Sequence, residues 1–268
     1  MSGSSSSPSP SPSDPDREAH EDLPPGCTLS YSAGSTRIDP FAYRVLDPTE
    51  DRLADLLTAF PALAAALGDT PPVALLAYPA RVFASLPRAI TVDTYLSGRT
   101  FARGLQLAAR LDRAAILVSQ PLIAWRLLAD YAERWSEWPR HLIVILGGYA
   151  CPRSLEEAIV SIVPSGRDRV SFLFGYGAAE VGAGCLLGSE RTPEGNVLYH
   201  PADPRVRPEI RGGELCLIAT RGREDEEPVV ARTGDSAEST LGGWLRSSSS
   251  VTIRTSGQTD PIASEIRW

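Results

Sequence analysis

The chain has 268 residues, 43% of them hydrophobic, so it is long enough to bury a core. Its formal net charge of -7 and its pI near 5.1 exclude sequence-independent electrostatic binding to nucleic acid or to an anionic membrane, so we expect neither as a partner. All 26 basic residues are arginines, which excludes Schiff-base chemistry by a lysine of this chain.

The cysteines and the apolar runs argue against export and membrane insertion. Cys27, Cys151, Cys185 and Cys216 lie far apart without a C-x-x-C pair, which favours neither a disulfide framework nor a zinc ribbon. No run approaches the roughly 18 to 20 apolar residues of a membrane helix, and the N-terminus lacks the features of a signal peptide. We therefore expect a reducing, cytoplasmic location.

The chain begins with a Ser/Pro-rich acidic segment, residues 1–26, which has too little apolar surface to offset the entropy of ordering. We expect this segment to be a disordered tail. From Cys27 onward, short apolar runs alternate with amphipathic stretches, a pattern that predicts an α/β fold. We expect a central, mostly parallel sheet flanked by helices, followed by a small β-rich C-terminal portion.

Three stretches have the spacing of amphipathic helices. PTEDRLADLLTAFPALAAAL predicts a helix that begins near Thr49, its N-cap, and that Pro61 kinks or splits. In RTFARGLQLAARL, Phe101 and Leu105 lie on one face of the predicted helix. PLIAWRLLADYAERW has Pro121 well placed for the first turn of another helix.

Short apolar runs predict the strands. VALLAY and AITVD are short candidates, whereas HLIVILGG and VSFLFGYG have the continuous apolar character of buried strands. Between the last two, CPRSLEEAIVSIV predicts a helix with a capping box at Ser154 and Glu157. The later runs GELCLIAT, EPVVART, WLR and VTIRT, separated by Gly, Asp and Ser, predict strands joined by turns.

Glycine-rich turns follow two of the predicted buried strands, at Gly147-Gly148-Tyr149 and at Gly175-Tyr176-Gly177. Such turns present backbone N–H groups at the carboxyl edge of a parallel sheet, where α/β proteins bind ligands. Either turn alone is more often a simple strand end. A small-residue loop at residues 32–36 precedes them and Arg232-Thr233-Gly234-Asp235 follows them, so their order is more informative than any one member.

In this order the motifs resemble those of the adenylate-forming superfamily, which includes acyl-CoA synthetases, peptide-synthetase adenylation domains and firefly luciferase. The series runs through Ser32-Ala33-Gly34-Ser35-Thr36, Gly147-Gly148, Gly175-Tyr176-Gly177-Ala178-Ala179-Glu180, Gly213-Glu214-Leu215 and Arg232-Thr233-Gly234-Asp235. YGAAEVG followed by GELCLIATRGREDEEPVVARTGD is most similar to the phenylacetate-CoA ligase and acyl-protein synthetase branch. The resemblance covers roughly residues 27–235, which we expect to be one adenylate-forming-like core.

The resemblance implies a role for each matching residue. Tyr176 would stack on adenine, and Gly148 and Gly177 would let the nucleotide approach the backbone. Glu180 would hold Mg²⁺ and serve catalysis, and Asp235 would accept hydrogen bonds from both ribose hydroxyls. The phosphates of ATP would be held by Ser32, Gly34, Ser35 and Thr36. A carboxylic acid would then attack the α-phosphorus, releasing pyrophosphate and leaving an acyl-adenylate.

Departures from the family pattern lie at the predicted chemistry. Arg37 replaces a glycine of the phosphate loop, where it would supply a cation, and Asp39 would place an anion near the phosphates. The loop also lacks the lysine of the family. Ala179 replaces the threonine that usually precedes Glu180, and losing one preorganised donor of this kind costs about a hundredfold to a thousandfold in rate.

The chain is also expected to be shorter than the family at both ends. Only the tail precedes the phosphate loop, and residues 236–268 are expected to form a short β-hairpin remnant in place of a lysine-bearing C-terminal domain. A sheet that has lost a covering layer exposes apolar area, so we expect a homodimer or a protein partner. Such a partner would also be a source of the missing lysine.

Zinc is an alternative ligand suggested by the side chains between the later motifs. Cys185, His200 and Cys216 form a usable zinc set. Their spacing is loose, however, and more typical of chance.

The sequence leaves two main functions open. One is a truncated adenylate-forming-type enzyme that uses ATP to activate a carboxylic acid or transfer it to an acceptor such as CoA or a carrier protein. The other is a degenerate family member that acts as a ligand-binding or scaffolding module in a biosynthetic pathway. Acyl chemistry without ATP is the least favoured. Retained Tyr176, Glu180 and Asp235 favour nucleotide use, whereas the altered phosphate loop favours inactivity.

Overall fold

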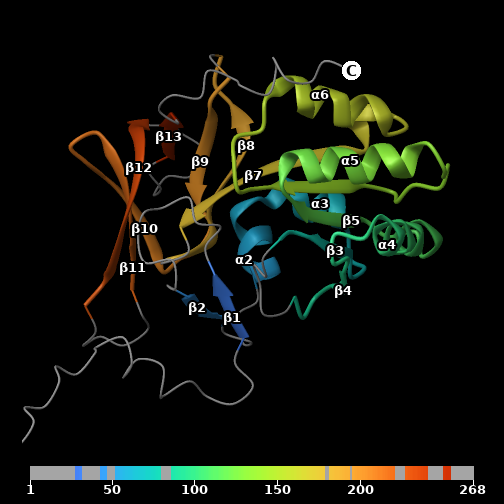
Figure 1. Cartoon of the computed structure of the whole chain (residues 1–268), viewed down its shortest axis with the longest axis horizontal. Helices are drawn as coiled ribbons and strands as arrows, with labels where there is room; N and C mark the ends of the chain where they lie inside the picture. Colours follow the sequence, from blue (N-terminus) through green and yellow to red (C-terminus); the bar gives the residue numbers. More distant parts are fainter. Residues whose placement is uncertain are drawn as a thin grey trace, which may run out of the picture.

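The computed structural model describes residues 28–31, 43–46, 52–79, 86–178, 181–193, 195–220, 227–240 and 250–254. These residues form a mixed α/β fold in which a mostly parallel, helix-flanked sheet continues into an antiparallel β-rich part (Figure 1). The predicted fold class is therefore confirmed. No helix in the described part of the chain has the length and apolar character needed to cross a membrane.

The parallel half of the main sheet is a set of five strands whose order is β4-β3-β5-β6-β7. They are β3 (Val73–Ala77), β4 (Ile90–Asp93), β5 (Ala115–Ser119), β6 (Leu142–Leu146) and β7 (Val170–Ala178). β5 and β6 are buried along their whole length, as continuous apolar runs predict for strands covered on both faces.

Helices cover both faces of this parallel half (Figure 1). One face packs against α4 (Gly98–Arg110), α5 (Pro121–Ala132) and α6 (Arg153–Ile162), and the other against α2 (Arg52–Ala59) and α3 (Pro61–Leu67). Alternate strand residues enter the two cores: Leu117 of β5 packs with the first group of helices, and Ile116 and Val118 with the second. Three layers result, with the sheet in the middle.

The helix boundaries confirm two of the predicted signals and correct a third. Pro61 splits the first predicted helix, because α2 ends at Ala59 and α3 begins at Pro61. Pro121 is the first residue of α5. The capping box is wrong, because α6 has Pro152 as its N-cap, which places Ser154 inside the first turn instead of before it. Thr49 lies outside the described residues.

The antiparallel part extends the sheet beyond β7 in the order β7-β8-β9-β13-β12-β11-β10. Its strands are β8 (Gly182–Arg191), β9 (Val197–Pro201), β10 (Val206–Arg211), β11 (Glu214–Ala219), β12 (Val229–Thr240) and β13 (Ser250–Arg254). A short 3₁₀ helix, η1 (Gly166–Asp168), precedes β7, and β1 (Thr28–Tyr31) pairs with β2 (Tyr43–Leu46) in a separate ribbon.

The antiparallel part of the sheet is strongly curved, and we refer to this curvature as the curl. β12 and β7 are separated by β8, β9 and β13 in the sheet, which in a flat sheet would place them about 19 Å apart. Their side chains nevertheless meet, since the Tyr176 hydroxyl of β7 hydrogen-bonds Asp235 of β12. A third apolar core, which includes Cys185, Leu215 and Ala231, fills the inside of the curl.

His141, just before β6, gives folding stability a predictable pH dependence. Its Nε2 lies 2.9 Å from Ser171 Oγ, and burial, assisted by the nearby Arg140, lowers its pKa below the ordinary value of 6.5. The unfolded chain then binds more protons than the folded chain just below that value, so stability is lost as the pH falls through about 6.5. We expect urea midpoints measured between about pH 8 and pH 5.5 to show this loss, and His141→Gln to reduce it.

His200 contributes in the same direction, because burial also lowers its pKa. His200→Gln is therefore a useful companion variant, and the double variant should have the flattest profile. A His141→Gln profile parallel to that of the native chain would contradict the assignment.

Candidate functional site

The glycine turn after β6 lies beside β7 at the carboxyl end of the parallel strands. A Cβ atom on Gly147 would lie 3.5 Å from the Gly175 carbonyl oxygen. Gly148 has a φ of +91°, a conformation that favours glycine. A Cβ there would also meet the Tyr78 hydroxyl at 2.6 Å and Gln120 Nε2 at 3.0 Å. Both predicted glycine segments thus come together, as the parallel topology requires.

Polar side chains surround this turn from the ends of neighbouring strands. Tyr78 follows β3, Gln120 follows β5 and Tyr149 follows Gly148. The Leu122 N–H, in the first turn of α5, donates to the Tyr149 hydroxyl at 3.0 Å. Burial raises the pKa of Tyr78, and a hydrogen bond with Gln120 opposes that shift. Phenol and amide groups are therefore gathered at the edge where α/β proteins bind ligands.

The second glycine segment is not the loop that its sequence predicts. β7 continues through Gly175, Tyr176 and Gly177 to Ala178 because β8 pairs with it antiparallel, Tyr176 opposite Leu186 and Ala178 opposite Gly182. One residue of β7, Gly177, there faces three of β8, which is a bulge. Tyr176 is thus carried on a strand beside a bulge, and not on a free turn.

Asp235 lies at a second bulge. Glu214 pairs with Ser236 and Cys216 with Arg232, so Leu215 of β11 faces three residues of β12, the last of which is Asp235. Glu214 Oε1 accepts a hydrogen bond from the Gly234 N–H at 3.0 Å, and Gly234 has a φ of +75°. Bulges re-aim side chains near functional sites, and this one directs Asp235 into the curl.

Tyr176 and Asp235 meet although 59 residues separate them in the sequence. The Tyr176 hydroxyl donates to Asp235 Oδ2 at 2.5 Å. The ring of Tyr176 also packs against Tyr199 of β9, with 5.8 Å between ring centroids and 60° between the planes. Burial raises the pKa of Tyr199 to about 12, so both phenols are neutral donors at neutral pH. The predicted adenine-stacking ring and the predicted ribose acceptor therefore share one site.

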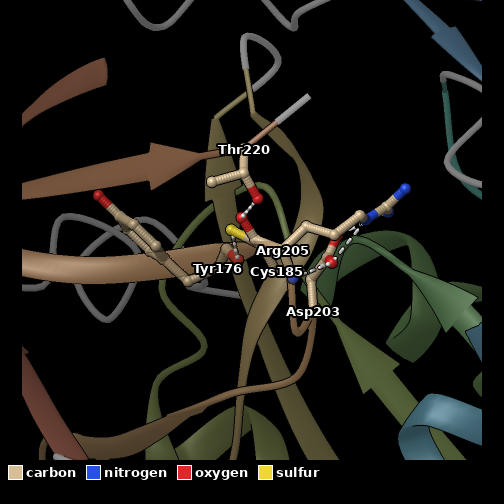
Figure 2. A network of polar contacts seen from close by, with 5 residues as sticks. All are labelled: Tyr176, Cys185, Asp203, Arg205 and Thr220. Atoms are coloured by element: carbon tan, nitrogen blue, oxygen red, sulfur yellow. Dashed lines mark hydrogen bonds and ion pairs between the residues drawn. The ribbon is translucent and has the colours of Figure 1, made fainter. Parts of the chain in front are cut away.

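A polar network fixes the backbone behind Tyr176 (Figure 2). The Cys185 thiol donates to the Tyr176 carbonyl at 3.6 Å, and the Cys185 carbonyl accepts from the Asp203 N–H at 3.2 Å. The fully buried Asp203 carboxylate pairs with Arg205 through two bonds of 2.9 Å, and Thr220 Oγ1 donates to the Arg205 carbonyl. Figure 2 shows the Tyr176 ring pointing away from the Asp203 and Arg205 side chains.

Not every predicted site residue can be placed. The phosphate-loop residues and the metal ligand lie outside the described part of the chain; they are Ser32, Gly34, Ser35, Thr36, Arg37 and Glu180. The predicted zinc set does not form, because no three His, Cys, Asp or Glu side chains among the described residues gather into a metal-binding group. Cys185 and Cys216 are instead buried on β8 and β11.

Sequence reasoning missed several residues of the site. Tyr199 packs on Tyr176, and Thr233 Oγ1 accepts the Asp235 N–H at 3.2 Å. Tyr78 and Gln120 could have been found from their places directly after predicted strands, where α/β proteins put ligand contacts. Tyr199 had no such signal, because its position depends on the curl of the sheet.

Solved structures resemble this fold. An acyl-CoA synthetase (AMP-forming)/AMP-acid ligase II-like protein from Dyadobacter fermentans aligns with a TM-score of 0.45 and 15% identity, over 86% of this chain and 60% of that one. Apo MatB from Rhodopseudomonas palustris aligns with a TM-score of 0.50 and 16% identity, over 85% and 48%. The likeness is one of fold.

A nonribosomal peptide synthetase, FmoA3, crystallised with α-methyl-L-serine-AMP, aligns with a TM-score of 0.47 and 13% identity, over 80% of this chain and 27% of that one. This chain spans between about a quarter and three fifths of the length of these three structures. No protein-family model and no curated protein matches the sequence.

Proposed function

We propose that this chain is an adenylate-forming-type nucleotide-binding domain that binds ATP or AMP and activates or transfers a carboxylic acid. The observation that carries the proposal is the hydrogen bond between Tyr176 and Asp235. Two motif residues that the resemblance assigns to one nucleotide meet there, across three intervening strands. The contact brings together, from separate strands, the two residues that would bind one adenosine.

The described residues fit the adenosine part of such a ligand. Asp235 is a half-buried carboxylate on the rim of the curl, suited to accept hydrogen bonds from a sugar diol. Tyr176 is a half-buried ring next to it, suited to stack on a base. Gly148 and Gly177 are exposed and lack side chains that would block a close approach.

The chemistry proposed is attack by a carboxylate oxygen on the α-phosphorus of ATP. One P–O bond forms and one breaks, pyrophosphate leaves, and an acyl-adenylate results. The thiol of an acceptor such as CoA or a carrier protein would then attack the acyl carbon, forming a C–S bond and breaking the C–O bond to the phosphate, so that AMP leaves. The chain contributes chiefly by holding the two reactants in line, which can supply a large part of the rate enhancement.

Phosphate and metal binding rest on the sequence resemblance. Arg37 would supply a cation to the hydroxyl-rich loop in a chain that has no lysine. Glu180 would hold Mg²⁺, whose charge would offset that of the phosphates. Phosphoryl transfer to an acid needs a further cation near the leaving group, and a protein partner or a second copy of the chain is one source.

The alternative function is a degenerate module that binds the nucleotide, or another ligand, without chemistry. Ala179, where the family has threonine, and Asp39 in the phosphate loop favour it, because each weakens handling of the triphosphate. The enzyme requires adenosine binding at Tyr176 and Asp235, and so does a module that retains the nucleotide. They differ in whether pyrophosphate exchange follows.

Calorimetric titration with ATP and Mg²⁺ tests the shared prediction. We expect the native chain to bind ATP and Asp235→Asn to bind it about 10- to 100-fold more weakly, because the amide loses charge-assisted hydrogen bonds to the ribose. Asp130→Asn on α5 is the matched control, since Asp130 pairs with Arg126 far from the site. Equal ATP affinity in all three proteins would contradict the site.

Pyrophosphate exchange across a panel of carboxylic acids then separates the two functions. Exchange supports the enzyme, and binding without exchange supports the module. Exchange that appears only after addition of a lysate fraction supports an enzyme completed by a partner. A native chain that does not bind ATP overturns the enzyme and leaves only a module for another ligand.

A further inference from the structure

Asp235 is held at two points, one on its side chain and one on its backbone. Its Oδ2 accepts the Tyr176 hydroxyl at 2.5 Å, and its backbone N–H donates to Thr233 Oγ1 at 3.2 Å. Thr233 is itself anchored, because its hydroxyl donates to the Leu215 carbonyl at 2.8 Å. The Thr233 bonds fix the backbone of the bulge, and the Tyr176 bond orients the carboxylate that this backbone carries.

The direction of the phenol bond is clear from the surroundings. Burial, with the hydrogen bond to Asp235 as the next cause, raises the pKa of Tyr176 far above its ordinary value. The phenol therefore keeps its proton at neutral pH and donates, while the carboxylate accepts. A carboxylate oxygen has two lone pairs, and within the described residues Oδ1 has no hydrogen-bond partner, so this oxygen is available to a ligand.

We propose that the Tyr176 hydroxyl is a positioning group that holds Asp235 with Oδ1 presented to the sugar, and that it thereby selects nucleotides with a ribose diol. The inference rests on the proposed function and adds a role that ring stacking does not require. A phenylalanine at this position would stack equally well on a base. The hydroxyl therefore acts by orienting the Asp235 carboxylate, and the oriented carboxylate selects the sugar.

The sugar preference follows from how a carboxylate recognises two neighbouring hydroxyls. An oriented carboxylate accepts both hydroxyl protons at once, one on each oxygen, and Oδ2 has a second lone pair beside the phenol bond. A carboxylate that rotates freely gains less binding free energy from the second hydroxyl, because forming that hydrogen bond then also costs the entropy of ordering the side chain. Removing the phenol should thus weaken binding of the diol and leave a dideoxy sugar unaffected.

Titration of the full chain with ATP and with 2′,3′-dideoxy-ATP, each with Mg²⁺, tests the inference. The native chain should prefer ATP. Tyr176→Phe should bind ATP about tenfold more weakly and dideoxy-ATP equally well, so that the preference falls by the same factor. Thr233→Val, which removes the acceptor of the Asp235 N–H, should lower the preference in the same direction. A loss of stability alone would weaken both ligands together.

Tyr131→Phe is the control for loss of a tyrosine hydroxyl, because that hydroxyl donates to the Glu137 carbonyl beside α5. It should leave both affinities unchanged. An unchanged preference in Tyr176→Phe overturns the inference, and so does tighter ATP binding, which would mean that the phenol competes with the sugar. In either case ATP binding by the native chain leaves the proposed function intact, whereas a native chain that binds neither nucleotide overturns both.

Discussion

Replacing Arg191 with leucine should lower the free energy of unfolding by about 3 to 5 kcal/mol, the usual cost of removing one partner of a buried ion pair. The guanidinium is 10% exposed and its Nε lies 3.0 Å from Oε2 of Glu156, which is 13% exposed. It also donates to the carbonyls of Cys151 at 2.8 Å and Gly195 at 2.9 Å, and its Cζ lies 4.4 Å from the centroid of the Phe174 ring. Leucine would leave an uncompensated carboxylate and two carbonyls.

Urea denaturation of two further variants checks this mechanism. Arg126→Leu removes an exposed partner of a helical pair, 65% exposed and 3.1 Å from Asp130, and should cost no more than about 0.5 kcal/mol. The double variant Arg191→Leu with Glu156→Leu should be less destabilised than Arg191→Leu alone, because no charge is left buried. Equal effects of Arg191→Leu and Arg126→Leu would contradict the buried-pair account.

Arg191 also connects stability to the candidate site. Its partners Cys151 and Glu156 belong to the segment that follows Gly147 and Gly148, while Arg191 itself ends β8. The side chain therefore fastens the glycine turn and the start of α6 to the antiparallel part. Arg191→Lys would keep the charge but lose the planar guanidinium that donates to three acceptors at once. The glycine turn should then be held less firmly to the antiparallel part, even where the chain still folds.

The parallel half of the fold was predictable because its signals are local. HLIVILGG is continuously apolar, and β6 is buried on both faces. Pro61 lacks the N–H that a helix interior needs, and the helix divides there. The capping box failed for a similarly local reason, since Pro152 is already the N-cap of α6 and Ser154 lies two residues too late to cap it. Such local signals predict where a helix or strand lies better than they predict the residues at which it begins and ends.

The antiparallel half was harder because bulges and edges disturb the period of two. β10 contains Pro208 and the charged residues Arg207, Glu209 and Arg211, which pair among themselves along an edge strand. β8 contains three glycines and faces bulges on both sides. Charges on an edge limit strand addition by other chains, and they interrupt the apolar alternation by which a strand is recognised in the sequence.

The candidate site was predicted in part, through the order of its motifs. Tyr176 and Asp235 were named from the resemblance, and the structure brings them into contact. The contact itself depends on the curl of six antiparallel strands, which no short segment encodes. Tyr199 is in the site for the same reason, and sequence alone could not place it there. Long-range geometry, not residue type, was the missing information.

Gly188→Ala should be the most damaging small substitution in the antiparallel part, lowering the free energy of unfolding by about 1 to 3 kcal/mol. At the bulge between β8 and β9, Leu187 pairs with His200 and Glu190 with Leu198, so Gly188 and Ser189 face a single residue, Tyr199. A Cβ on Gly188 would lie 2.3 Å from the Leu198 carbonyl oxygen and 2.5 Å from Val197 Cγ1. A carbonyl in a strand cannot move aside without breaking the pairing.

Gly175→Ala on the adjoining strand is the matched control, because a Cβ there would have no neighbour closer than 3.6 Å. It should cost clearly less in the same urea titration. Moving β9 away from Gly188 also moves Tyr199, whose ring packs on Tyr176. Gly188→Ala should therefore lower both ATP affinity and the free energy of unfolding. A Gly188→Ala chain as stable as Gly175→Ala would show instead that β9 accommodates the methyl group and that the bulge is loosely packed.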